Sequence, residues 1–255
     1  MSQLELNEVE QAALDLVENT PSPGKHCARN AYRHLKRAWS LDVVDLEMAA
    51  FRAITAEEEA ASAIFHSLRR RGYRGARKLN TWKHLHKNAV VPFCTAVAGV
   101  LAMTEGAGIK SGLYLDKSEN PWRFRVQINV EHVVPGKKYA YPEPPLNFTI
   151  SSDSHPHDFT DKLEEIAKKK NLPSIKKYLE GRANMRNRIL YASPKGAPEV
   201  TSLGNFLTTQ RQNVFILVVL YLMIDSYPKK QLFVQQCLQS FLKMLDLLPE
   251  GIKFD

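Results

Sequence analysis

Two stretches, Ala28-Arg-Asn-Ala-Tyr-Arg-His-Leu35 and Ala56-Glu-Glu-Glu-Ala-Ala-Ser-Ala-Ile-Phe-His66, decide the fold of this chain. They predict two antiparallel helices. On the second helix, small residues recur at alternating steps of four and three, which aligns them on one face: Ala49, Ala53, Ala56, Ala60 and Ala63. A second apolar stripe lies beside the first and consists of Phe51, Ile54, Ala61 and Phe65.

Two carboxylates interrupt this apolar pattern, with Glu57 on the first stripe and Glu58 on the second. An unpaired buried carboxylate is costly, so both glutamates need cationic or hydrogen-bonding partners. We expect the upstream basic helix to supply them, since it carries Arg29, Arg33, Lys36 and Arg37.

The composition is that of a globular intracellular protein. The 255 residues are 44% apolar, enough for a substantial core. Cys27, Cys94 and Cys237 are odd in number and far apart, which excludes a disulfide framework or zinc site and favours a reducing compartment. The acidic N-terminus is unlike a signal peptide. The longest apolar run, residues 214–224, is too short to span a bilayer and predicts a buried helix. We therefore predict a cytoplasmic protein that does not contact a membrane.

The hydrophobic periodicity predicts a mainly α fold, an antiparallel helical bundle with a small antiparallel β insertion. We expect one domain over residues 1–255 with the insertion at about 110–155. Predicted strands follow the alternating apolar residues from Phe124 to Val130 and from Leu146 to Ile150, with a third strand at Leu113–Leu115. Predicted helices cover about 3–19, 26–40, 44–71, 82–103 (kinked or restarted at Pro92), 159–170, 173–191, 201–226 and 228–247.

Positive charge is concentrated in one part of the chain. The net charge is +8, and no Asp or Glu occurs from Ala60 through Thr104. That stretch instead carries a set of cations that we predict to bind RNA or another polyanion: Arg69, Arg70, Arg71, Arg74, Arg77, Lys78, Lys83 and Lys87. The alternative is a solvated basic loop between helices.

The segment Arg29-Asn-Ala-Tyr-Arg-His34 resembles the Arg-to-His motif of HEPN ribonucleases. The resemblance implies that Arg29 holds the scissile phosphate, that Asn30 orients the pair, and that His34 is the general acid or base. It also implies chemistry without a metal or other cofactor, in a homodimer that pairs two copies of the motif. Alternatively, Arg29 pairs with Glu57 or Glu58 and His34 packs or faces solvent.

More of the chain resembles abortive-infection proteins of the AbiV type within the HEPN-like superfamily. The similar parts are Asn30-Ala31 and the alanine repeats that end in Glu57-Glu58, followed late in the chain by Arg186-Asn-Arg-Ile-Leu-Tyr191 and a turn at 193–198. The resemblance implies an antiviral protein that engages RNA. It gives Glu57 or Glu58 the role of positioning an arginine, with Arg186, Asn187 and Tyr191 as supporting residues.

One departure from the family matters, because Tyr191 stands where a late catalytic histidine is expected. The alternative for Arg186 is therefore a basic helix face or a partner for the internal glutamates. The alternative function is a non-catalytic module that holds RNA, or a viral or ribosomal protein, and halts translation.

Two further groups of residues are candidates for binding. One group consists of Arg77, Lys78 and Trp82 followed by His84, His86 and Lys87, and basic residues beside an aromatic ring suit a base and its phosphate. The alternative is a helix start with Trp82 in the core. A histidine-rich loop around Asp153 and His157 is better explained as a polar turn than as a metal site.

Overall fold

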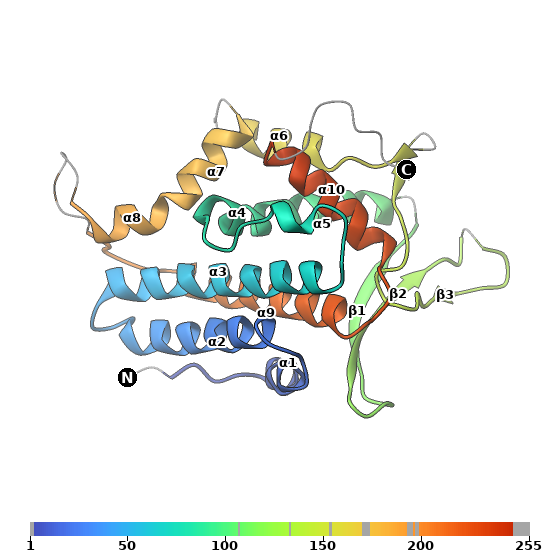
Figure 1. Cartoon of the computed structure of the whole chain (residues 1–255), viewed down its shortest axis with the longest axis horizontal. Coiled ribbons are helices and arrows are strands. Elements are labelled where there is room, and N and C mark those ends of the chain that lie inside the picture. Colours follow the sequence, from blue (N-terminus) through green and yellow to red (C-terminus); the bar gives the residue numbers. More distant parts are fainter. Residues whose placement is uncertain are drawn as a thin grey trace. The chain divides into compact units, whose positions relative to one another are not determined.

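The computed structural model describes residues 3–106, 108–132, 134–152, 155–169, 174–192, 196 and 199–246. It is mainly α-helical with a small antiparallel sheet, which confirms the predicted fold class (Figure 1). The chain divides into two compact units that alternate along the sequence. The first comprises the chain up to Ser67, Thr81–Val90 and Tyr178–Leu222, and the second comprises Leu68–Asn80, Val91–Lys177 and the residues from Met223 onward.

The helices match the predicted ones, with two additional breaks. The predicted helix 82–103 is interrupted at Ala89, and Pro92 lies in the first turn of the second part, where a missing N–H costs little. The predicted helix 173–191 is interrupted at Asn184. The bounds are α1 Glu8–Glu18, α2 Gly24–Leu41, α3 Leu46–Arg70, α4 His84–Asn88, α5 Val90–Gly106, α6 Thr160–Lys169, α7 Ile175–Ala183, α8 Met185–Leu190, α9 Phe206–Asp225 and α10 Leu232–Met244, with a 3-10 turn at Ala76–Lys78. Except for Gly196, the predicted turn at 193–198 lies outside the described residues.

In the first unit, α2 and α3 run antiparallel, side by side (Figure 1). The small-residue stripe of α3 is fully buried, as predicted, because alanines let neighbouring helices approach closely. Ala38 of α2 meets Ala53 of α3 and Leu207 of α9 in one apolar cluster. Asn7 caps α1, and the buried Glu10 of the same cap accepts a hydrogen bond from Arg211 Nε of α9 at 2.7 Å.

The second unit holds the sheet and an aromatic core. Strands β1 (Ser111–Asp116), β2 (Arg123–Asn129) and β3 (Tyr139–Ala140) are antiparallel in that order, with Leu113 opposite Val126. A separate two-stranded ladder joins β4 (Ser151–Ser152) and β5 (His155–Pro156). The strands predicted at 113–115 and 124–130 are therefore confirmed. Next to the sheet, Phe93 of α5 contacts Phe241 of α10 edge to face, at a centroid distance of 5.2 Å.

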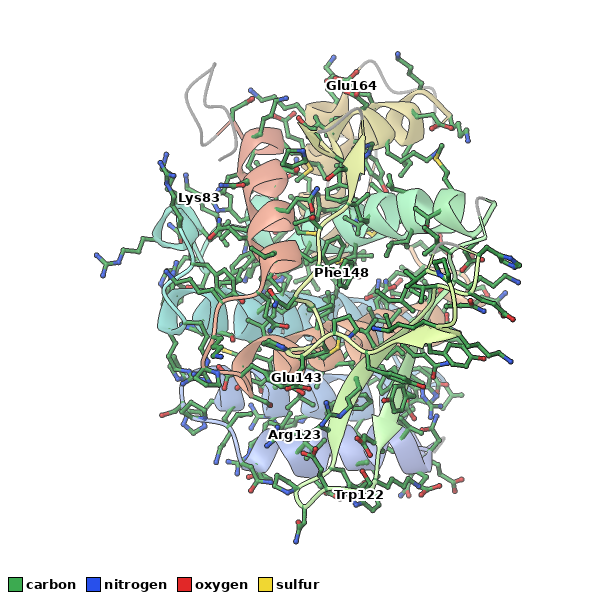
Figure 2. The ribbon with its side chains drawn as sticks, turned by 90° about the vertical axis from the view of Figure 1, so that its right-hand side faces the viewer. Lys83, Trp122, Arg123, Glu143, Phe148 and Glu164 are labelled. Atoms are coloured by element: carbon green, nitrogen blue, oxygen red, sulfur yellow. The ribbon has the colours of Figure 1, made fainter. Side chains whose placement is uncertain are left out.

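The strand predicted at Leu146–Ile150 is wrong. Leu146 lies in a turn and residues 147–150 belong to no strand, although the Ile150 carbonyl accepts His157 N at 2.9 Å beside the β4–β5 ladder. Glutamine side chains bind the rest of this backbone, since Leu146 N donates to Gln231 Oε1 at 2.8 Å and Ile150 N donates to Gln236 Oε1 at 3.1 Å. Phe148 stacks on Phe233 of α10 at 4.6 Å between centroids (Figure 2). The alternating apolar residues of this segment therefore reflect packing of one face against a helix, and not hydrogen bonding within the predicted sheet.

Among the described residues, two helical segments are long and apolar enough to cross a membrane by length and composition alone: His84–Glu105 and Phe206–Asp225. The structure buries 44% of the most apolar window of the first segment and 56% of that of the second. The core helix of a soluble protein passes the same test of length and composition. Val214, Leu217 and Val218 are at most 1% exposed, which confirms the buried helix predicted there.

Gly24 at the start of α2 tests the packing of the first unit. A Cβ at this position would lie 2.8 Å from Tyr221 Cε2 and Oη, and Tyr221 Oη donates to Thr20 Oγ1 at 2.7 Å. We expect Gly24→Ala to lower the free energy of unfolding in urea by about 1–3 kcal/mol through overpacking. The matched control is Gly181→Ala in α7, where no atom lies within 4 Å. That variant should gain about 0.5–1 kcal/mol, and equal effects of the two changes would contradict the close approach.

Candidate active site

The buried carboxylates of α3 have partners from four other helices of the first unit. Glu57 and Glu58 are each 1% exposed. Arg182 Nη2 of α7 donates to Glu57 Oε1 at 2.9 Å, and Asn213 Nδ2 of α9 donates to Glu57 Oε2 at 3.1 Å. Both oxygens of Glu57 are thus satisfied, so this carboxylate is a structural anchor.

Glu58 is held by three side chains of α4. His84 Nδ1 lies 2.8 Å from Glu58 Oε1, Asn88 Nδ2 donates to the same oxygen at 2.7 Å, and Lys87 Nζ lies 3.1 Å from Oε2. Positions three and four residues apart share a face of a helix, so this short helix aims all three groups at one carboxylate.

Arg186 of α8 completes the cluster. Its guanidinium lies 4.4 Å from the ring centroid of Phe51, and its Nη1 lies 3.2 Å from His84 Nε2 and 3.8 Å from Glu58 Oε2. An arginine only donates hydrogen bonds, so Nε2 is the acceptor and Nδ1 carries the ring proton that His84 gives to Glu58. The contacts therefore select one tautomer of His84.

The cluster runs from the interior to solvent. The Glu58 side chain is 2% exposed, whereas those of Arg186 and His84 are 27% and 40% exposed. Within the described part of the chain, three cations (Lys87, Arg182 and Arg186) face two carboxylates, which leaves a surplus positive charge. An oriented imidazole beside a partly exposed guanidinium can bind an anion and move a proton at Nε2.

His34 lies next to this cluster but is not equipped as its acid. It is buried, and Arg52 Nη1 lies 3.4 Å from its Nδ1. Burial lowers the pKa of His34 to about 4, and the charges of Arg52, Arg33, Arg37 and Arg186 act in the same direction. At that pKa the ring is neutral near pH 7 and has no proton to donate.

The structure does not bring Arg29 to His34. Arg29 is exposed and forms an ion pair with Glu18 of α1, which corrects both the expected catalytic pair and the alternative pairing with Glu57 or Glu58. Five helical residues rotate a side chain by about 140°, so the two residues point in different directions. Asn30 Oδ1 is buried and has no hydrogen-bond partner in the structure.

The expected source of partners for the glutamates is also wrong. None of Arg29, Arg33, Lys36 or Arg37 forms a described ion pair with Glu57 or Glu58. The alternative for Arg186, a partner for the internal glutamates, is confirmed. Sequence reasoning missed Arg182, Asn88 and Asn213. No local pattern marks them, because Asn184 separates Arg182 of α7 from Arg186 of α8, and Asn88 and Asn213 lie on two further helices.

Asn187 and Tyr191 lie outside the cluster. Both are exposed, and the carbonyl of Asn187 accepts the backbone N–H of Tyr191 at the end of α8. The predicted supporting role therefore falls to Arg186 alone among these three.

The predicted basic surface is only partly available. Arg69 donates to the carbonyl of Leu79, and Arg70 and Arg71 donate to Asp225, so all three serve their own chain. Lys87 is buried against Glu58. The remaining members of the set are exposed: Arg74, Arg77, Lys78 and Lys83, the last of which is labelled in Figure 2.

Trp82 is not in the core, which corrects that alternative, since it is 88% exposed. The histidine-rich loop cannot be assessed as a unit because Asp153 lies outside the described residues. Among the residues that are described, no three His, Cys, Asp or Glu side chains group as metal ligands.

Comparisons of the chain with protein-family models, with curated proteins and with solved structures find no match. The resemblance to the HEPN-like superfamily accordingly stays a prediction.

The Glu57–Arg182 pair predicts strong coupling between α3 and α7. Arg182→Met would leave Glu57 with Asn213 alone, so we expect a loss of about 3 kcal/mol in unfolding free energy. Combining it with Glu57→Gln should recover part of that loss, because the buried charge is then gone. A double-mutant cycle in urea measures the coupling, and additive effects within about 0.5 kcal/mol would contradict it.

His34 predicts a pH dependence of stability. Its pKa is about 4 in the folded chain and 6.5 as the ordinary value, so protons favour the unfolded state between these limits. Stability should fall by about 2 kcal/mol from pH 7 to pH 5 through this group. We expect His34→Gln to remove that part of the slope in urea titrations, whereas His26→Gln on the exposed side of α2 should keep it. Identical slopes in all three proteins would refute the assignment.

Proposed function

We propose that this chain binds RNA and cleaves it without a metal ion, with His84 as the acid–base group and Arg186 as the phosphate ligand. The observation that carries the proposal is the line of contacts from buried Glu58 through His84 to Arg186. This pair replaces Arg29 and His34. The antiviral abortive-infection role and the homodimer, which the resemblance implies, belong to the same proposal, as does the cytoplasmic location predicted from the composition.

The chemistry follows from donors and acceptors. A phosphate oxygen accepts the N–H groups of Arg186, which releases Nε2 of His84. Nε2 takes the proton of the ribose 2′-hydroxyl, the O2′–P bond forms, and the P–O5′ bond breaks. Nε2 then returns the proton to O5′, leaving a 2′,3′-cyclic phosphate and a 5′-hydroxyl. Glu58 stabilises the imidazolium between the two transfers, since it accepts the bond from Nδ1.

The second candidate is a module that binds without cleavage. It is favoured by the contact of Arg186 Nη1 on His84 Nε2, which occupies the nitrogen that catalysis needs. Exposed cations of the first unit such as Lys83 would then hold RNA, or an acidic viral or ribosomal protein, by charge alone.

The deciding experiment is cleavage of mixed cellular RNA in the presence of a metal chelator. His84→Ala should lower the rate at least about 100-fold, the usual range for an acid–base group. Arg186→Ala should also lower it, because the phosphate loses its ligand. Denaturing electrophoresis and detection of cyclic phosphate ends provide the readout.

Arg29→Ala is the matched control, since Arg29 is exposed and outside the cluster. It should cleave like the wild type, and thermal unfolding checks that every variant is folded. Cleavage lost in Arg29→Ala but kept in His84→Ala would return the site to the early helix. A wild type that binds RNA with a steep salt dependence but never cuts it would establish the binding module instead.

A further inference from the structure

Trp82 is the most exposed large hydrophobic side chain among the described residues, at 88%. Single exposed apolar side chains are ordinary on protein surfaces. The position of Trp82 is unusual, because it comes two residues before His84, the first residue of α4. Two extended residues span at most about 7 Å, so the backbone holds the Cα atoms of Trp82 and His84 within that distance.

The surroundings of Trp82 suit a polyanion. Lys83, which lies between Trp82 and His84, is exposed (Figure 2). Arg186 adds a second partly exposed cation at His84. No acidic residue occurs in the sequence from Ala60 through Thr104, so no nearby carboxylate along the chain opposes a phosphate.

We infer that Trp82 is a base-stacking platform: an unpaired nucleobase lies on the indole while its adjoining phosphate lies between Lys83 and Arg186. The inference rests on the proposed function and adds the form of its substrate. A base inside a duplex has both faces covered by its neighbours, whereas an unpaired base has a face free for an aromatic side chain. The site therefore takes single-stranded nucleic acid at the nucleotide it contacts.

The test separates stacking from catalysis by using a probe that this chemistry cannot cut. A fluorescein-labelled ten-nucleotide oligothymidylate lacks the 2′-hydroxyl yet keeps bases and phosphates. Its affinity is measured by anisotropy for wild type, Trp82→Ala, Trp82→Phe and Trp122→Ala. Trp122 is the matched control, since it is 39% exposed with Lys117 Nζ 5.0 Å from the centroid of its ring. A blunt DNA duplex with the same number of phosphates is titrated in parallel.

We expect Trp82→Ala to weaken binding of the single strand roughly 5- to 100-fold, the range for loss of one stacked base. Trp82→Phe should retain most of the affinity, and Trp122→Ala should match the wild type. Duplex binding should be unaffected by any of the three changes. Trp82 is too exposed for its replacement to unfold the chain, so a loss reports on the contact.

Equal affinities of Trp82→Ala and wild type would overturn the inference. So would an equal loss for single strand and duplex, or no binding of the single strand by the wild type. Each result is independent of the cleavage assay. If His84→Ala abolishes cleavage while Trp82→Ala binds normally, the ribonuclease proposal stands and the stacking platform falls. If the wild type does not cut RNA and Trp82→Ala loses the single strand, the stacking platform stands and the ribonuclease proposal falls.

Discussion

The two adjacent carboxylates buried in α3 determine how the first unit is assembled. A helix that is apolar all round could rotate or slide against its neighbours at little cost, but Glu57 and Glu58 cannot be left without partners. Their donors come from α4, α7, α8 and α9, segments that lie far apart in the sequence. Each donor reaches its oxygen only in one register of its helix. The charges thus specify an arrangement that alanine packing alone would leave loose.

The sequence predicted this constraint but not its solution. Periodicity shows which face of α3 is buried, and burial of a carboxylate demands a partner. Which cation pairs with each buried carboxylate depends on helices that come together only in the folded chain. The basic side chains of α2 were the expected candidates, yet the structure pairs Arg29 with Glu18 of the preceding helix. The same limit explains the wrong prediction at Leu146–Ile150. Alternating apolar residues show that one face is buried, but they do not show whether the backbone is hydrogen-bonded to a strand or to the side chains of Gln231 and Gln236.

The candidate site shows why spacing along one helix is a weak guide to chemistry. Arg29 and His34 fit a motif by their separation, but about 140° of rotation divides their directions. His84 and Arg186 are 102 residues apart and in contact, so no local pattern could join them. What the sequence did supply was each residue separately: a histidine in a stretch without acids, and an arginine considered as a partner for the glutamates.

Glu58 connects folding and chemistry in one group. Its carboxylate needs α4 in order to be buried, and the same contact fixes the ring proton of His84 on Nδ1. Lys87 also accompanies Glu58, so Arg186 is one of two cations at this carboxylate, and its side chain over Phe51 is 27% exposed. In the proposed reaction the imidazole would be oriented before substrate binds, and a phosphate would displace the Arg186 contact from Nε2. The partners that stabilise two buried charges would then also position the cluster for a phosphate.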